Sequence, residues 1–151
     1  MKIAITSGYY NPIHSGHVDY LEGAKALADI HVAIINNDMQ VEIKGSVPFM
    51  DQWERMSIVG ALRSVDLAYL SVDKDGSQCK SLKSLAKQLR YKYPGCEILF
   101  CNGGDRGRDN IPENGICEEV GIQLYFGVGG TTKKNSSSKI IANAHPISDI
   151  I

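Results

Sequence analysis

The segment from Ser7 to His17 constrains the fold of this chain most, because it holds two histidines where a strand is expected to turn into a helix. The apolar run Ile3 to Ile5 before it predicts a buried strand, and apolar residues at helical spacing follow it from Val18 to Ala28. The first turn of a helix carries unpaired N–H groups and a partial positive charge, both of which favour phosphate. His14 and His17 would then direct two imidazole donors at one anion.

Two glycines of the same segment, Gly8 and Gly16, would let the main chain approach such a ligand closely. The alternative is a turn that happens to contain two histidines, one capping the helix and one packed beneath it. The preceding strand, the lead Gly-Tyr-Tyr-Asn-Pro and the helix behind it favour the phosphate-binding interpretation.

The rest of the chain alternates short apolar runs with helical patterns. This alternation predicts an α/β fold, a Rossmann-like doubly wound parallel sheet of about five strands with helices on both faces. The segment 39–47 has no sustained period and predicts a mobile connection that carries Lys44. Further strands are predicted at Ile30 to Ile35, Leu67 to Val72, Glu97 to Cys101 and Ile122 to Phe126. Helices are predicted after Pro48 with an end near Val65-Asp66, within Ser77 to Tyr93, from Pro112 to Val120, and from Ser136 or Ser137 onward.

Length and composition favour one domain over residues 1–151, with 43% apolar residues to fill a single core. The formal net charge of -1 provides no global attraction to nucleic acid or to an anionic membrane. No apolar run approaches the roughly 20 residues that span a bilayer, and no signal-peptide pattern opens the chain. The four cysteines show neither paired nor zinc-like spacing, so we expect reduced thiols in a cytoplasmic protein.

The pattern His-x-Gly-His after an N-terminal strand resembles the nucleotidylyltransferase superfamily, which is cytidylyltransferase-like and in which both histidines contact the nucleoside triphosphate. Within it the chain is most similar to glycerol-3-phosphate cytidylyltransferase and to the heptose-phosphate adenylyltransferase domain. The similarity covers nearly the whole chain. Its matching stretches are Gly8 to Leu21, Asn36 to Asp38, Lys44-Gly45, Glu54 to Asp66, Gly103 to Asp105 and the serine run 136–138.

The resemblance implies a role for each matching residue. The serine run looks like the family's second phosphate motif, although an ordinary serine N-cap is the alternative. A solvated basic surface is the alternative for Lys44, Arg55 and Arg63. The implied catalytic residues are His14, His17 and Lys44; the nucleotide-binding residues are Ser7, Gly8, Tyr9, Tyr10, Gly16, Gly104, Asp105, Ser136, Ser137, Ser138 and Lys139; the acceptor-binding residues are Lys44, Arg55 and Arg63; no residue is assigned to a metal.

Three departures from the family pattern matter. Tyr10-Asn11 stands where the two relatives have Phe-Asp, and Asn-Pro-Ile-His is similar to nicotinate-mononucleotide adenylyltransferases. The cations near the serine run are Lys133 and Lys134 instead of an arginine, so they lack its bidentate fork. Arg106 has no fixed counterpart; it contacts the nucleotide or pairs with Asp105 or Asp109.

The resemblance implies a Mg²⁺-dependent, homodimeric enzyme that transfers a nucleoside monophosphate from CTP or ATP and releases pyrophosphate. The expected acceptor is a polyol or sugar phosphate, such as glycerol 3-phosphate or a heptose phosphate, and neither nucleic acid nor a membrane is an expected partner. One alternative is an adenylyltransferase acting on nicotinate or nicotinamide mononucleotide or on phosphopantetheine. The other is a catalytically silent nucleotide-binding domain.

Overall fold

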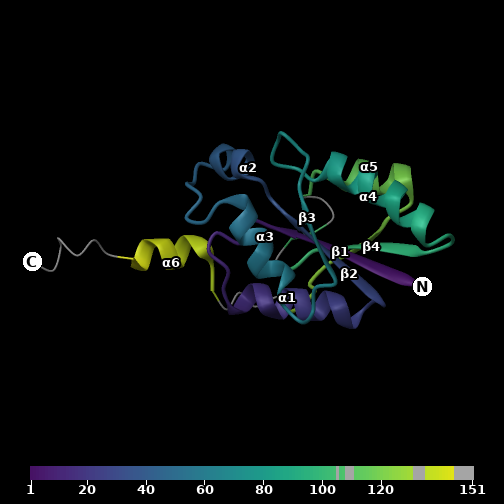
Figure 1. Ribbon diagram of the computed structural model, residues 1–151, viewed down its shortest axis with the longest axis horizontal. Helices are drawn as coiled ribbons and strands as arrows, with labels where there is room; N and C mark the ends of the chain where they lie inside the picture. Colours follow the sequence, from purple (N-terminus) through teal and green to yellow (C-terminus); the bar gives the residue numbers. More distant parts are fainter. Residues whose placement is uncertain (105, 108–110, 131–134, 145–151) are drawn as a thin grey trace, which may run out of the picture.

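Five parallel strands in the order β3-β2-β1-β4-β5 form the centre of the computed structural model, which describes residues 1–104, 106–107, 111–130 and 135–144. Every neighbouring pair is parallel, so the carboxyl ends of the strands meet at one edge of the sheet (Figure 1). The predicted α/β class and Rossmann-like sheet are confirmed. The strands are β1 (Lys2–Gly8), β2 (Ile30–Ile35), β3 (Leu67–Leu70), β4 (Glu97–Cys101) and β5 (Gln123–Tyr125).

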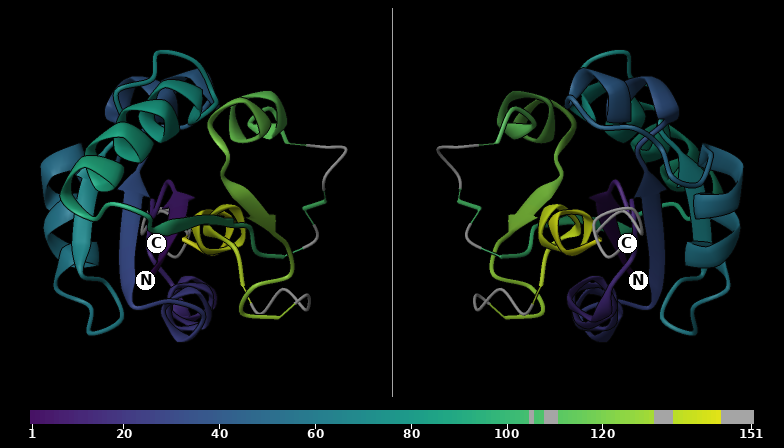
Figure 2. Two further views of the ribbon diagram at one scale, coloured as in Figure 1. Left: turned by 90° about the vertical axis from the view of Figure 1, so that its right-hand side faces the viewer. Right: turned by 90° about the vertical axis from the view of Figure 1, so that its left-hand side faces the viewer.

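Helices cover both faces of the sheet. Helices α4 and α5 pack on one face, and α1 and α3 pack on the other, as the two views of Figure 2 show along the strands. None of the described helices combines the length and apolar composition that a membrane crossing requires. The helices are α1 (Ser15–Ala26), α2 (Asp38–Ile43), α3 (Gln52–Gly60), α4 (Cys79–Lys92), α5 (Asn114–Val120) and α6 (Ser137–Asn143).

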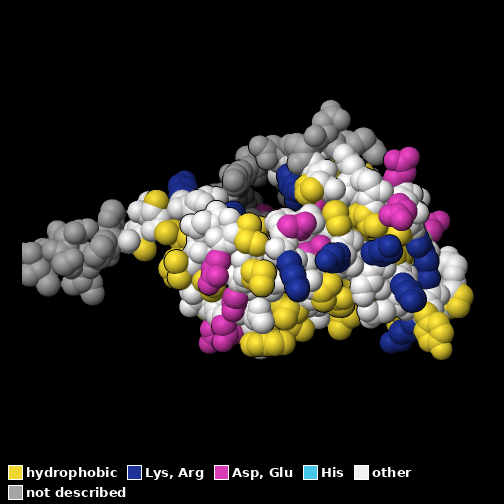
Figure 3. Space-filling view, turned by 90° about the horizontal axis from the view of Figure 1, so that it is seen from above, with side chains coloured by type: hydrophobic (Ala, Val, Ile, Leu, Met, Phe, Trp, Pro, Cys, Tyr) yellow, Lys and Arg dark blue, Asp and Glu magenta, His cyan; other side chains and the backbone are white. Residues whose placement is uncertain are grey.

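The core follows from the alternation of side chains along each strand. In β1, Ile3 and Ile5 pack against Leu82 and Leu85 of α4, whereas Ala4 between them belongs to the cluster that contains Ala24 of α1. The opposite side of α4 is polar and exposes Lys83 and Lys87. Figure 3 shows Lys and Arg side chains on the face of the molecule seen from above. The helical apolar pattern of the sequence therefore identifies the buried side of α4 correctly.

The prediction of a mobile connection over residues 39–47 was wrong, because α2 occupies most of that segment. Asn37 caps the helix by accepting from the backbone N–H of Gln40, and the Gln40 side chain accepts from the backbone N–H of Asn37 at 3.0 Å. A helix of 6 residues is too short to show an apolar period, so only the cap signalled it.

Helix α3 also ends earlier than predicted, at Gly60 instead of Val65. The chain continues through two tight turns, in which Leu62 N donates to Val59 O at 3.2 Å and Val65 N donates to Leu62 O at 3.0 Å. These turns keep Leu62 and Val65 on the core side, which is why the apolar spacing extends beyond the helix.

The loop after β5 approaches α1 backbone to backbone at Gly129. This glycine has φ +82°, and a Cβ atom there would lie 2.6 Å from Cα of Tyr20. Both the left-handed backbone and the close approach exclude a side chain. The contact fixes this loop beside the first turns of α1, at the carboxyl edge of the sheet.

We expect Gly129→Ala to lower the free energy of unfolding by at least about 2 kcal/mol, because strain at positive φ adds to overlap with the Tyr20 backbone. The matched control is Gly115→Ala in α5, where a Cβ would meet nothing within 4 Å. That change should be neutral or stabilising by helix propensity. Urea unfolding of both variants measures the difference, and equal midpoints would contradict the close approach.

Candidate functional site

Two neighbouring cavities open at the carboxyl edge of the sheet. The larger has a volume of about 350 Å³ and the smaller about 220 Å³. Their linings have five residues in common, so the cavities meet along a shared wall. The shared residues are Ser7, His17, Lys44, Arg106 and Ser137.

Residues from both ends of the chain come together in these cavities. Segments after β1, β2 and β4 contribute, as does the start of α6, which extends outward from this edge (Figure 1). Of the residues implied by the resemblance, the larger cavity is lined by Ser7, His14, Gly16, His17, Lys44, Gly104, Ser136, Ser137 and Ser138, and the smaller is lined additionally by Gly8 and Tyr9.

The two histidines begin α1 as a reciprocal capping pair. Nδ1 of His14 accepts from the backbone N–H of Gly16 at 3.1 Å, and Nδ1 of His17 accepts from the backbone N–H of His14 at 3.1 Å. The rings stack with centroids 3.8 Å apart. Because an accepting Nδ1 carries no proton, each neutral ring has its N–H at Nε2. The helix start therefore sets the tautomer of both rings.

His17 is held in its neutral form. Burial, then His14 and then Lys44 lower the pKa of His17 to about 3. Tyr10 packs edge-on to the His17 ring, with centroids 4.9 Å apart, and itself belongs to the buried core. The site thus offers His17 as an uncharged hydrogen-bond donor near neutral pH.

Lys44 reaches the shared wall from the C-terminal end of α2. Its Nζ lies 4.2 Å from the centroid of the Tyr9 ring, a cation–π contact that directs the ammonium group toward the cavities. The sequence predicted a mobile connection around Lys44, whereas the structure places this residue as the C-cap of α2.

The start of α6 confirms the N-cap interpretation of the serine run, and its place beside a cavity leaves the phosphate-binding interpretation a prediction. Ser136 Oγ accepts from the backbone N–H of Lys139 at 3.0 Å, as an N-cap does, and Ser136 also lines the larger cavity. Ser137 Oγ donates to the carbonyl of Pro12 at 2.8 Å. This last bond ties the serine run to the segment that carries His14.

Four residues of the predicted site lie outside both cavity linings. Tyr10 is buried in the core, Lys139 is exposed, and Arg63 is exposed with its guanidinium 3.1 Å from Glu22. Arg55, the fourth, is fully buried. Their assigned roles stay predictions. Asp105, Asp109, Lys133 and Lys134 lie outside the described residues.

The guanidinium of Arg55 is bonded to several segments at once. Nη1 donates to the carbonyls of Tyr9 and Asn36, each at 2.7 Å, and Nε donates to the carbonyl of Met50 at 3.0 Å. Nη2 donates to a carboxylate oxygen of Asp38 at 2.7 Å. Arg55 thereby joins the ends of β1 and β2 to α2 and α3.

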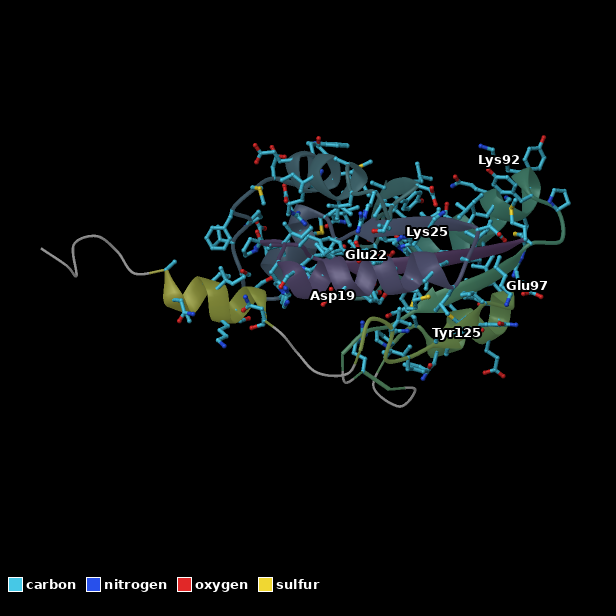
Figure 4. The ribbon with its side chains drawn as sticks, turned by 90° about the horizontal axis from the view of Figure 1, so that it is seen from below. Asp19, Glu22, Lys25, Lys92, Glu97 and Tyr125 are labelled. Atoms are coloured by element: carbon cyan, nitrogen blue, oxygen red, sulfur yellow. The ribbon has the colours of Figure 1, made fainter. Side chains whose placement is uncertain are left out.

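Several residues of the cavities were not predicted from the sequence. Tyr20 follows His17 by one helical turn, so the spacing i, i+3 was the signal that could have found it. Its hydroxyl accepts from Ser7 N at 3.3 Å and donates to the carbonyl of Cys101. Asp19 also lines the larger cavity, and Figure 4 shows it at the end of α1 nearest α6. Gly103 lies in the stretch Gly103 to Asp105 that already matched the family, whereas Gln78 and Glu113 gave no such signal.

Within the described part of the chain, no three His, Cys, Asp or Glu side chains are grouped so that they could hold a metal ion. Arg106, which the sequence left without an assignment, lines both cavities, and its Nη2 lies 3.7 Å from Oε1 of Glu113.

Comparison with known proteins identifies the family. The family model described as cytidylyltransferase-like matches residues 5–143. The bifunctional protein HldE of Geobacter metallireducens is 28% identical over 144 residues, which cover 93% of this chain and 27% of that protein. HldE of Actinobacillus succinogenes is 33% identical over 124 residues, covering 76% of this chain and 25% of that protein. The chain therefore spans about a quarter of the length of these relatives.

Two solved structures share the fold at lower identity. The lipopolysaccharide core biosynthesis protein of Thermoplasma volcanium has a TM-score of 0.64 at 22% identity, with 90% of this chain and 99% of that chain covered. A putative nicotinate-nucleotide adenylyltransferase of Vibrio parahaemolyticus has a TM-score of 0.60 at 18% identity, with 93% of this chain and 84% of that chain covered.

We expect the His17 ring to remain neutral from pH 8 down to about pH 4, because its pKa is lowered to about 3. An unfolded histidine titrates near 6.5, so below that pH the unfolded chain binds the additional proton. The contribution of His17 therefore makes the free energy of unfolding fall as pH falls from about 6.5 toward 3. NMR titration of ¹⁵N-labelled imidazoles checks this, and a His17 midpoint near 6.5 would contradict the described burial.

Arg55→Met should lower the free energy of unfolding by at least about 3 kcal/mol, because each buried carbonyl left without a donor costs about 1–3 kcal/mol. Arg63→Met is the matched control, since the Arg63 side chain is 90% exposed. An exposed ion pair contributes little, so this variant should unfold within about 0.5 kcal/mol of the parent. Chemical denaturation compares the two, and equal stabilities would argue against a structural role for Arg55.

Proposed function

We propose that this chain, which belongs to the cytidylyltransferase-like family, transfers a nucleoside monophosphate from CTP or ATP to a small phosphorylated acceptor and releases pyrophosphate. The acceptor in this proposal is a polyol or sugar phosphate. The triphosphate occupies the larger cavity and the acceptor occupies the smaller one. Single-domain organisation, a homodimer and a cytoplasmic location stay predictions.

The shared wall between the two cavities is the observation that carries the proposal. A transfer reaction must bring two anionic substrates into contact at one point, and their repulsion must be offset there. The shared wall holds two cations, Lys44 and Arg106, together with the neutral donor His17. This combination suits two phosphates that meet between the cavities.

The chemistry requires few protein groups. A phosphomonoester has its second pKa near 6, so at neutral pH the acceptor is largely a dianion and needs no general base. One of its oxygens attacks the α-phosphorus, the bond from that phosphorus to the bridging oxygen breaks, and the electron pair leaves with pyrophosphate. Charge grows on the leaving oxygens, where fixed donors and cations stabilise it.

The histidine pair fits the role of fixed donors. Because both Nδ1 atoms accept backbone N–H groups, both Nε2–H groups are set before substrate arrives. A neutral imidazole donates without exchanging a proton, which matches a reaction in which no proton is transferred. Lys44 and Arg106 supply the positive charge.

In this proposal Mg²⁺ enters with the triphosphate as part of the substrate. The described residues offer no cluster of metal-ligating side chains, so the triphosphate oxygens and water supply most of its ligands. The ion neutralises phosphate charge when bound. The protein holds the complex through its donors.

We expect His17→Ala to lower kcat on the order of a hundred- to a thousandfold, as removal of one transition-state donor does. Lys44→Ala should also reduce kcat/KM, whereas Lys87→Ala on the exposed side of α4 should leave it unchanged. Pyrophosphate release is measured with each NTP and a panel of sugar and polyol phosphates, followed by cofactor precursors. Near-normal turnover by a folded His17→Ala variant would contradict the proposal, and triphosphate binding without release on any acceptor would favour a silent binding domain.

A further inference from the structure

Two buried polar side chains line the smaller cavity and have no part in the mechanism above. Gln78 is 3% exposed and directly precedes α4, and Glu113 is 2% exposed and directly precedes α5. Both line the cavity of about 220 Å³ that also contains Lys44 and Arg106. Glu113 follows Gln78 by 35 residues in the sequence, so only the fold brings the two residues to one wall of the cavity.

Each of these side chains has one oxygen without a hydrogen-bond partner. The two atoms are Oε1 of Gln78 and Oε2 of Glu113. Buried polar atoms are nearly always paired, because removing them from water without compensation is costly. Two unpaired acceptors on residues that line one cavity point to a ligand that brings hydrogen-bond donors.

The charges around the cavity select the kind of donor. Arg106 Nη2 lies 3.7 Å from the other carboxylate oxygen of Glu113, so the negative charge already has a partner. Lys44 adds a second cation to the same lining. An ammonium group would meet two cations, and an alkyl group would leave both oxygens unpaired. Neutral hydroxyl groups satisfy both conditions.

The pKa of the Glu113 carboxyl reflects both its burial and the charges around it. Burial raises the pKa of the Glu113 carboxyl, while Arg106 and the backbone N–H of Gln78 oppose that rise, and Asp73 and Asp75 add to it.

We propose that Gln78 and Glu113 accept hydrogen bonds from hydroxyl groups of the acceptor and so select polyol and sugar phosphates over alkyl and amino phosphates. The proposal rests on the proposed function. With the acceptor phosphate held at the shared wall by Lys44 and Arg106, its hydroxylated part extends into the smaller cavity toward these two oxygens. Both residues determine specificity; neither touches the reacting phosphorus.

Matched acceptors test this selection. Glycerol 3-phosphate is compared with n-propyl phosphate, which keeps the phosphate and the three-carbon skeleton without the hydroxyls. Mannose 1-phosphate is compared with cyclohexyl phosphate, which keeps the phosphate and a six-membered ring without the hydroxyls. Ethanolamine phosphate tests the ammonium group. Binding is measured by calorimetry on the full chain, and pyrophosphate release is measured with Mg²⁺ and either CTP or ATP.

The parent protein should prefer a hydroxylated probe over its counterpart by about 10- to 100-fold, the range of a hydrogen bond to a charged group. Glu113→Gln and Gln78→Met should each reduce that ratio several-fold and leave the affinity for the counterpart nearly unchanged. Glu118→Gln and Gln88→Met, which alter exposed residues of the same two helices, are the matched controls and should preserve the ratio.

The outcomes separate this inference from the proposed function. Turnover with no preference for hydroxylated probes, or with a preference that both variants retain, would overturn the inference and leave the function standing. Preferential binding of hydroxylated probes that Glu113→Gln reduces, without pyrophosphate release from any NTP, would support the inference and count against the function. Stronger binding of ethanolamine phosphate than of glycerol 3-phosphate, or binding of no probe, would overturn the inference.

Discussion

The buried guanidinium of Arg55 holds the carboxyl edge of the sheet together. It donates to carbonyls at the ends of β1 and β2, to the loop before α3, and to Asp38 at the start of α2. A planar fork with several fixed donors can bind this many acceptors at once, which a lysine cannot do. The positions of the loops around the cavities depend on these hydrogen bonds. One of these loops carries Tyr9, whose ring contacts Lys44.

The histidine pair combines a structural role with the proposed chemical one. The same bonds that cap α1 at its first turn also set the tautomer of each ring. A histidine that caps the helix is therefore compatible with a histidine that binds phosphate, so the two interpretations of the sequence do not exclude each other. In each ring Nδ1 accepts a hydrogen bond from the start of the helix, and this bond fixes the orientation of Nε2.

Packing brings distant segments to the same edge. Gly129 allows the loop after β5 to contact α1 through backbone atoms, and Ser137 is tied to the Pro12 carbonyl. The cavities are thus lined by loops that a rigid sheet positions, which is the usual arrangement of ligand sites in parallel α/β folds.

The sequence by itself determined the alternation of strands and helices along the chain apart from α2, the parallel sheet, and the place of His14 and His17 at the end of the first strand. These features follow from local periodicity and capping, which a chain encodes within a few residues. Helix α2 escaped prediction because it is too short to show a period. The tertiary structure alone decided that Arg55 is buried while Arg106 reaches both cavities, and that Gln78 and Glu113 share a wall. The direction in which such a side chain points depends on how loops from separate strands pack together, and sequence spacing does not record it.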